Sequence, residues 1–287
     1  MREGKLSTTS TWVAALRGLY TYTPGLGTAH DPIAQQLVTR RLAGLLGSIR
    51  QIPSGTTLAH RLLGLGTLGL SYNVALRSRA IDEVIQSALS RGIQQVVILG
   101  AGLDARAWRL ACLATATVYE IDHPATQAYK RACMHGESPL SQALHYVSVD
   151  FEKDDLTAAL TRSGFDSAAP SVWLWEGVTM YLSQAAIDET LAHVRQASAP
   201  RSLIAFTYVV PSYGPLWIRA LGQIGSRVIG ETLRGAMSPP EVAQKLTKLD
   251  FQLSSDETAE DWAFRYWPKS EARRVRAWEH LAVAERQ

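Results

Sequence analysis

The chain has very little cysteine: two residues, Cys112 and Cys133, in a sequence of 287. They do not form a Cys-x-x-Cys pair, and two thiols cannot cross-link a chain of this length into a disulfide framework. We therefore interpret both as reduced residues with structural roles, and we expect the protein to reside in the cytoplasm. Metal-site patterns are lacking too, because the histidines show none of the spacings typical of zinc ligands, and we expect no metal.

Long apolar runs and an excess of one charge sign are absent as well. The most apolar window, Leu62 to Leu70, has about half the length of a membrane-spanning helix and contains three glycines. The N-terminal residues lack the sustained apolar core of a signal peptide. With 29 basic and 26 acidic residues, the net charge of +3 is too balanced for a nucleic-acid-binding protein. We therefore expect neither a membrane nor a nucleic acid as a partner, and the oligomeric state stays open.

Residues 1–90 have the pattern of helices. Asp31 followed by Pro32 is typical of a helix cap with proline at the first helical position, and it predicts a helix over Ile33 to Leu46. Ser71 to Leu89 carries apolar residues at helical spacing and predicts a longer helix. Because the whole segment precedes the first strand, we expect it to stand outside the central sheet, as a helical lid over the site.

From residue 94 onward, short apolar runs alternate with helical stretches. This alternation predicts a doubly wound α/β fold, in which a parallel sheet is covered by helices on both faces. We expect a single domain over 1–287 whose cofactor-binding core spans 94–210. The predicted strands are Gln95–Gly100, Thr117–Asp122, His145–Asp150, Ser171–Glu176 and Ser202–Val210, and the helices between them are Ala105–Ala114, Pro124–Met134 and Gln184–Ala197.

The last part of the chain has a different pattern. Residues 211–240 are interpreted as an inserted helical segment on the substrate side. Ser238, followed by two prolines and Glu241, then predicts the start of a helix. Residues 241–287 further predict an antiparallel hairpin and a terminal helix. The two hairpin strands bring the mostly parallel sheet to seven strands. The hairpin strands are predicted at Phe251–Ser255 and Ala263–Trp267, and the amphipathic helix at Lys269–Ala284.

A glycine turn and an acid follow the first two predicted strands. Gly100 and Gly102 lie between a strand and a helix, where glycine lets the backbone approach a ligand closely. The same Gly-x-Gly pattern also occurs in plain tight turns and in dinucleotide-binding proteins. Asp122, about 20 residues further on, is placed to accept hydrogen bonds from ribose hydroxyls. NAD and S-adenosylmethionine both contain that ribose, so these residues alone do not discriminate between them.

Acidic residues also end the third and fourth predicted strands, at Asp150 and Glu176. Because the carboxyl ends of parallel strands line one crevice, these two acids with Asp104 and Asp122 predict an acidic ring. Such a ring would repel a pyrophosphate and attract a sulfonium or an ammonium group, by on the order of a few kcal/mol per pair at about 4 Å. Taken singly, each acid is equally well explained as a helix cap or surface charge; together they favour S-adenosylmethionine over NAD.

Four segments resemble the leucine carboxyl methyltransferase family, including its bacterial natural-product O-methyltransferase branch. They are, in order, VVILGAGLDARAWRL, YEIDHP, YVSVDFEKDDL and WLWEGVTMYL, within roughly residues 30–210. The resemblance implies a class I methyltransferase fold that uses S-adenosylmethionine and releases S-adenosylhomocysteine. The sequence departs from the family over residues 211–235, where substrate specificity is often carried, so the family's substrate does not transfer.

Carried over by position, the resemblance implies a set of cofactor contacts. Asp122 would hold the ribose, and Asp150 and Phe151 the adenine. Gly100 and Gly102 would line the methionine moiety, with Asp104 beside them and Glu176 near the amino group. Arg77, in the segment Arg77-Ser-Arg79, would bind the cofactor carboxylate, with Arg79 as the alternative.

The predicted reaction is methyl transfer to an oxygen of a small acidic molecule, in secondary metabolism. A carboxylate is already ionised at neutral pH, whereas a phenol or an enol often requires a general base. Tyr181 and His123 are the candidate bases, and their alternatives are a core aromatic residue and an ordinary loop histidine. Two competing hypotheses remain open: an NAD-dependent oxidoreductase, and a non-catalytic binding module of the same fold.

Overall fold

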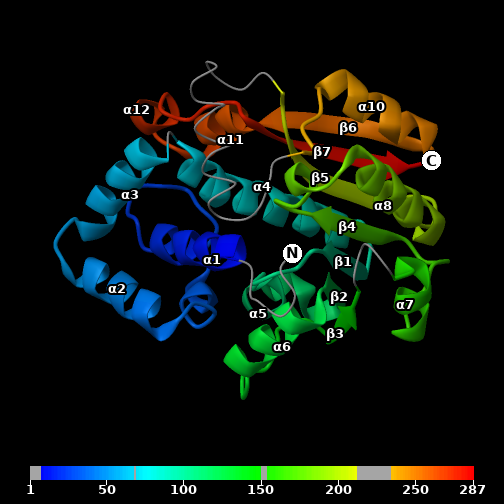
Figure 1. Ribbon diagram of the computed structural model, residues 1–287, viewed down its shortest axis with the longest axis horizontal. Coiled ribbons are helices and arrows are strands. Elements are labelled where there is room, and N and C mark those ends of the chain that lie inside the picture. The colour runs from blue at the N-terminus through cyan, green and yellow to red at the C-terminus, as the bar shows by residue number, and fades with distance from the viewer. Residues whose placement is uncertain (1–7, 68, 150–153, 212–233) are drawn as a thin grey trace.

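A seven-stranded sheet runs through the centre of the structure (Figure 1). The computed structural model describes residues 8–67, 69–149, 154–211 and 234–287. The strand order is β3-β2-β1-β4-β5-β7-β6; β1 to β5 are parallel, and β7 is antiparallel to both of its neighbours. This confirms the predicted doubly wound, mostly parallel sheet with an antiparallel C-terminal end. The strands are β1 (Gln95–Leu99), β2 (Thr117–Asp122), β3 (Ala143–Ser148), β4 (Ser171–Trp175), β5 (Leu203–Val209), β6 (Phe251–Thr258) and β7 (Glu279–Arg286).

Helices cover both faces of the sheet. Every residue of β1 is buried, and its side chains alternate: Val96 and Ile98 join one core, Val97 and Leu99 the other. The first core also contains residues of α1, α4 and α11, and the second contains residues of α7, α8 and α10. The helices are α1 (Thr8–Thr21), η1 (Pro32–Gln35), α2 (Arg40–Gln51), α3 (Gly55–Gly66), α4 (Leu70–Ser90), α5 (Arg106–Arg109), η2 (Ala111–Thr115), α6 (Pro124–Cys133), α7 (Leu156–Arg162), η3 (Thr179–Tyr181), α8 (Gln184–Ala197), α10 (Pro239–Lys248), α11 (Ala259–Tyr266) and α12 (Lys269–Ala272).

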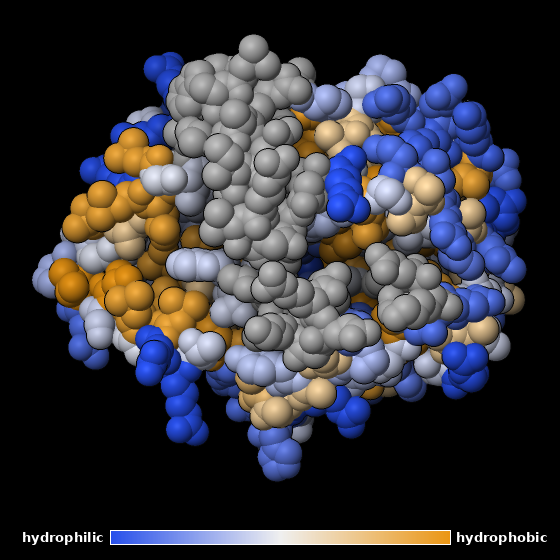
Figure 2. All heavy atoms as spheres, in the orientation of Figure 1, coloured by the Kyte–Doolittle hydropathy of each residue, from blue (hydrophilic) through white to orange (hydrophobic). Residues whose placement is uncertain are grey.

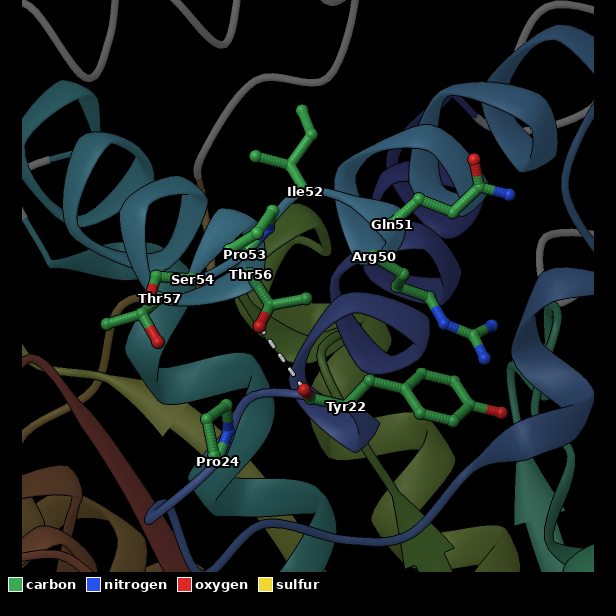
Figure 3. A pocket seen from close by; sticks show the side chains of 9 residues that line it. All are labelled: Tyr22, Pro24, Arg50, Gln51, Ile52, Pro53, Ser54, Thr56 and Thr57. Carbon is green, nitrogen blue, oxygen red and sulfur yellow. Dashed lines mark hydrogen bonds between the residues drawn. The ribbon is translucent and has the colours of Figure 1, made fainter.

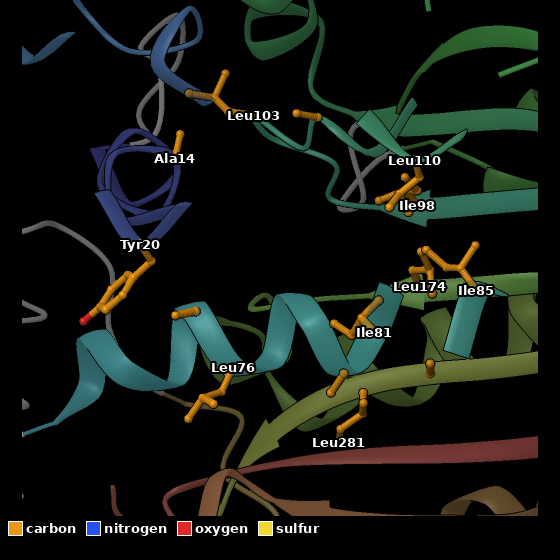
Figure 4. Packing of buried hydrophobic residues seen from close by; sticks show 14 of the residues in the cluster. Ala14, Tyr20, Leu76, Ile81, Ile85, Ile98, Leu103, Leu110, Leu174 and Leu281 are labelled. Carbon is orange, nitrogen blue, oxygen red and sulfur yellow. The ribbon is translucent and has the colours of Figure 1, made fainter. Parts of the chain in front are cut away.

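Helix α4 belongs to the layer that covers the sheet. Figure 4 shows Ile81 and Ile85 beside Leu174 of β4, and all three side chains are fully buried. The expectation that the entire segment 1–90 stands outside the sheet is therefore wrong for α4. The reason is that its apolar stripe, which the sequence shows, is wide enough to pack directly on the strands. Only α1, η1, α2 and α3 are free to act as a lid.

The first predicted helix is shorter than expected. Asp31 does cap a helix that begins with Pro32, because its carboxylate accepts the N–H of Ala34 at 2.9 Å. That helix is the short 3-10 turn η1, however, and the predicted continuous helix over Ile33 to Leu46 is wrong. The extended backbone of Thr39 interrupts it, and the Thr39 side chain then caps α2.

The C-terminal part contains two further differences. Helix α10 starts at the predicted place with a Ser238–Glu241 capping box. The predicted strand Ala263–Trp267, however, lies mainly within helix α11, which a Thr258–Asp261 capping box opens. The predicted helix Lys269–Ala284 is also wrong, because only α12 is helical and β7 follows it. Both faces of β7 carry small apolar side chains, a pattern that periodicity alone does not separate from a helix.

The predicted inserted segment 211–240 lies largely outside the described residues, which resume at 234. Within the described part of the chain, no helix combines the length and the hydropathy needed to cross a membrane.

Candidate functional site

The carboxyl ends of β1 and β4 meet where the strand order reverses, which is the usual ligand crevice of such sheets. The loop after β1 contains Gly100 and Gly102, with φ angles of 63° and 49° in the left-handed region. A Cβ on Gly100 would come within 2.7 Å of the Val178 side chain, and one on Gly102 within 3.3 Å of Ser10 on α1. Both glycines are therefore required by a close approach as well as by their backbone conformation.

Asp122, the last residue of β2, points toward this loop. Its carboxylate accepts the backbone N–H of Gly102 at 2.5 Å and that of His123 at 2.6 Å. Burial raises the pKa of Asp122, against the lowering effect of these two N–H donors. Among the residues that the structure describes, Asp122 forms no ion pair. It is thus a buried anion whose remaining lone pairs are available for a ligand that donates hydrogen bonds.

The neighbouring acid on β2 has a different role. Glu120 forms a buried ion pair with Lys130 of α6, at 2.6 Å. Burial raises the pKa of Glu120 to about 7, although Lys130 opposes the rise. Glu120 is therefore occupied by Lys130 within the protein, whereas Asp122 faces the glycine loop.

Asp104 caps the helix that follows the glycine loop. It accepts the backbone N–H of Arg106 at 2.7 Å, and its second oxygen pairs with the Arg106 guanidinium. Burial by itself would raise the pKa of Asp104, but Arg106, Lys130 and Arg17 together bring it below its usual value. Helix α5 has only four residues. Its N-terminus is a single turn whose first N–H, that of Arg106, already donates to a carboxylate, which disfavours the binding of a pyrophosphate there.

Glu176, just after β4, is held by two guanidinium groups. Its carboxylate accepts from Arg77 at 2.9 Å and from Arg106 at 2.8 Å. Burial opposes ionisation, but the two arginines outweigh it and hold the pKa of Glu176 far below its ordinary value. The predicted acidic ring is therefore not a set of bare charges, because Asp104 and Glu176 are both paired with arginine.

Arg77 is buried at the centre of this arrangement, with only 7% of the residue exposed. Besides Glu176 it binds Glu279, the first residue of β7, at 2.9 Å. A Cβ on Gly177 would lie 2.9 Å from the Arg77 guanidinium, so glycine makes room for this contact. Two carboxylates of the protein, Glu176 and Glu279, therefore compensate the buried charge of Arg77 without a ligand.

Arg79, the alternative to Arg77, points elsewhere. Its side chain is 39% exposed, pairs with Glu83 at 3.3 Å and lies over the ring of Tyr266. The geometry therefore favours Arg77 as the arginine at the crevice.

The ion pairs extend into one buried network that sequence reasoning missed. Arg106 also binds Asp82 of α4 at 2.8 Å, and Asp82 binds Arg109 at 2.6 Å. The only sequence signal was the position of Arg106 beside the glycine loop; the other partners come from distant segments. Within the described ranges, the network contains four arginines, Arg17, Arg77, Arg106 and Arg109, and five carboxylates, Asp31, Asp82, Asp104, Glu176 and Glu279. It thus carries one negative charge in excess, in addition to that of Asp122.

The N-terminal helix α1 rests on the glycine loop. Arg17 donates a hydrogen bond to the backbone oxygen of Leu103. It also forms an ion pair with Asp31 at 2.8 Å. Ser10 lies against Gly102, as noted above. These contacts place α1, a predicted part of the lid, over the carboxyl end of β1.

The remaining predicted residues have mixed outcomes. His123 caps α6, with its Nδ1 accepting the N–H of Ala125 at 3.2 Å. Tyr181 is half-buried in the turn η3 that follows the Glu176 loop. Asp150 and Phe151 lie outside the described residues. Across the described ranges, no group of three or more side chains has the composition of a metal site.

A family model described as "Leucine carboxyl methyltransferase" matches residues 10–195. The chain belongs to this family. The matched range includes α1, the glycine loop, Asp122 and Glu176, but not β5, β6 or β7. The family assignment therefore covers the crevice and its N-terminal cover.

Two relatives illustrate the similarity within the family. A protein of Mycobacteroides abscessus, whose name gives S-adenosyl-L-methionine-dependent methyltransferase as its expected activity, is 40% identical over 188 residues, covering 63% of this chain and 58% of that protein. A protein of the same name from Mycobacterium sp. (strain KMS) is 41% identical over 157 residues, covering 54% and 51%. The chain thus matches little more than half the length of these curated relatives.

Two solved structures share the fold. A protein of Thermobifida fusca, whose expected activity is methyl transfer, has a TM-score of 0.62 at 19% identity and covers 100% of this chain and 97% of that one. A DUF574 family protein of Streptomyces avermitilis has a TM-score of 0.61 at 13% identity, covering 83% and 92%. At these identities the likeness concerns the fold alone, which is that of class I methyltransferases.

Replacing Glu176 by glutamine is expected to lower the free energy of unfolding by roughly 3–5 kcal/mol at neutral pH, because two buried guanidinium groups lose a counter-ion. The folded-state pKa of Glu176 is depressed, so its contribution is complete above the unfolded pKa of about 4.3 and is lost as the pH falls below it. The difference between wild type and Glu176→Gln should therefore shrink in acid.

Urea denaturation over a range of pH measures this difference. Glu189→Gln, which changes an exposed acid of α8, should follow the wild type at every pH. Equal stability of Glu176→Gln and wild type at neutral pH would contradict the structural role of the network.

Proposed function

We propose that this chain is an S-adenosylmethionine-dependent methyltransferase that methylates an oxygen of a small acidic molecule. The observation that carries the proposal is the electrostatics of the crevice. Asp122 is a buried carboxylate held by two backbone N–H groups and the Thr126 side chain, without an ion pair among the described residues. The adjacent network has, within the described ranges, one carboxylate more than it has arginines. A ligand with ribose hydroxyls and a net positive charge satisfies both features. Family membership and the names of the relatives support the same activity.

The described residues fit this cofactor. Asp122 would accept hydrogen bonds from the ribose hydroxyls, in place of or beside the N–H of Gly102. Gly100 and Gly102 would let the methionine moiety lie against the backbone, and Arg77 and Glu176 would take its carboxylate and its amino group. Asp150 and Phe151 remain the proposed adenine contacts. The excess negative charge beside Asp104 and Glu176 would attract the sulfonium.

The NAD-dependent oxidoreductase is the weaker hypothesis. Dinucleotide sites bind pyrophosphate with free N–H groups at a helix N-terminus. Here the N–H of Arg106 already donates to Asp104, and α5 is a single turn. The non-catalytic binding module is disfavoured by a crevice that keeps its buried acid and its two left-handed glycines.

When bound, S-adenosylmethionine supplies a methyl group activated by a positively charged sulfur. The protein has to hold the acceptor oxygen in line and to exclude water. Helix α1, fixed to the glycine loop through Arg17, is placed to exclude water from the crevice. A neutral imidazole whose Nδ1 accepts a hydrogen bond carries its proton on Nε2, so His123 has no free lone pair for use as a base.

This arrangement favours an acceptor that is ionised without help. Tyr181 could act as a base only as a phenolate, whose ordinary pKa is about 10. A carboxylate needs no base, and the family description also names a carboxyl group. We therefore propose a small carboxylic acid of secondary metabolism as the first candidate acceptor, with phenols and enols after it, and the cytoplasm as the place of the reaction.

A methyl-transfer screen tests the function directly. The full chain is incubated with methyl-labelled S-adenosylmethionine and panels of carboxylic acids, phenols and enols, and label in the organic product is measured. We expect esters to form before ethers. Folded protein that gives no calorimetric heat with S-adenosylmethionine or S-adenosylhomocysteine, but is thermally stabilised by NAD, would replace this proposal by the oxidoreductase.

Asp122→Asn is expected to weaken the binding of S-adenosylhomocysteine by roughly 10- to 100-fold, because charge-assisted hydrogen bonds to the ribose are replaced by neutral ones. Isothermal titration calorimetry measures the dissociation constant. Glu137→Gln, at an exposed acid after α6, provides the matched control and should bind as the wild type does. An unchanged constant for Asp122→Asn would remove this residue from the cofactor site.

Arg77→Lys is expected to weaken S-adenosylhomocysteine binding by about tenfold or more, because lysine cannot hold Glu176, Glu279 and a ligand carboxylate at once. Arg79→Lys should have little effect. Methylthioadenosine, which lacks the amino-acid part, separates binding from stability: the affinity of Arg77→Lys for it should equal that of the wild type. If Arg77→Lys lost the same affinity for both ligands, Arg77 would act only by stabilising the fold.

A further inference from the structure

Helices α2 and α3 expose an unusual number of apolar side chains. Leu58, Leu62 and Leu65 follow the spacing of one face of α3, and they are 58%, 59% and 75% exposed. Leu45 lies on α2 and Ile52 directly after its last residue, and they are 56% and 58% exposed. Figure 2 shows apolar surface gathered over these helices at one end of the molecule. We call the five side chains the α2–α3 face; contiguous apolar surface of this kind usually marks a binding site.

The charge around this face is entirely positive in the sequence. From residue 32 to residue 81 there is no aspartate or glutamate. Arg40, Arg41, Arg50 and Arg61 are exposed in the same two helices. Among the described residues, Arg61 alone of these four forms an ion pair, with Glu271 at 3.7 Å. A partner that covers the face must therefore accept both aliphatic side chains and several cations.

A cavity of about 540 Å³ opens beside the face, at the bend between the two helices (Figure 3). Ile52 belongs to both the cavity and the face. Arg50 lines the cavity, with its guanidinium 3.4 Å from the centre of the Tyr22 ring, and the hydroxyls of Ser54 and Thr57 line it too. This lining is complementary to an anionic group of modest size.

We propose that the α2–α3 face docks on an anionic lipid surface, with the leucines entering the boundary of the acyl chains and the arginines at the level of the headgroups. Aliphatic side chains flanked by arginine are the composition of helices that lie in a membrane interface. A second copy of the chain fits less well, because a twofold contact would bring the same uncompensated arginines together. A protein partner fits less well too, because leucine is under-represented among the residues that dominate protein interfaces.

This docking does not require a membrane-spanning segment and leaves the crevice free. The α2–α3 face lies on the helices that precede α4, whereas the glycine loop is covered by α1. The proposal does not depend on the reaction that the crevice performs. It departs from the expectation of no membrane partner, which rested on the lack of a membrane-spanning helix.

Co-sedimentation of the full chain with vesicles tests the proposal. The protein should bind vesicles in which phosphatidylglycerol replaces part of the phosphatidylcholine, should bind pure phosphatidylcholine weakly, and should be released by salt. Replacing Leu58, Leu62 and Leu65 by glutamine should lower the partition coefficient by about tenfold or more. Replacing Arg40 and Arg41 by glutamine should lower it by roughly fivefold per arginine.

Matched controls lie elsewhere on the surface. Leu140→Gln with Phe264→Gln removes apolar side chains that are 46% and 55% exposed, and Arg162→Gln with Lys248→Gln removes exposed cations of α7 and α10. Both should bind vesicles as the wild type does. Because the changed residues are exposed, the thermal melts of all variants should coincide.

Hydrogen–deuterium exchange on the wild type gives an independent measurement, with slower exchange expected over residues 40–66 when anionic vesicles are added. Three results would overturn the proposal. They are no binding to anionic vesicles at low salt, equal binding by the leucine variant and its control, and a concentration-dependent dimer that the leucine substitutions dissociate.

Discussion

The interaction on which the rest of the structure depends is the buried contact of Arg77 and Arg106 with Glu176. It joins α4, the glycine loop and the end of β4 at the point where the strand order reverses. Buried ion pairs of this kind contribute little net stability relative to a well-packed apolar core, because both charges lose their hydration. Their effect is geometric, because the contacts tie the glycine loop, helix α1 and β7 to one another through Arg17, Arg106 and Arg77.

The network also changes the meaning of the acids at the strand ends. Viewed one by one, Asp104 and Glu176 are neutralised by arginines, and only Asp122 lacks a cationic partner among the described residues. Attraction for a cation therefore arises from the sum of the network rather than from each carboxylate. A small excess of negative charge in a region of low dielectric acts over a longer distance than the same charge at the surface.

Much of the parallel sheet could be predicted from the sequence, because β1, β2, β4 and β5 are apolar runs bounded by turns, and their terminal residues include Asp122 and the position before Glu176. The pairings could not be predicted. Arg77 and Glu279 lie 202 positions apart, and no local pattern connects them. Local sequence also does not determine the structure at the C-terminal end, which explains the wrong predictions there. Trp262 and Ala263 are apolar residues compatible with either a strand or a helix, and tertiary packing selects the helix. The α2–α3 face could not be predicted either, because the exposure of its leucines depends on tertiary packing and not on local sequence.

The position of β7 has a consequence for how the chain is made. This strand follows all the others in sequence, yet it lies inside the sheet, between β5 and β6. Until residues 279–286 have left the ribosome, β5 lacks its β7 partner and Arg77 lacks Glu279. The nascent chain must therefore pass through a stage in which a long apolar strand edge and a buried cation are both incomplete, a combination that exposes folding intermediates to aggregation.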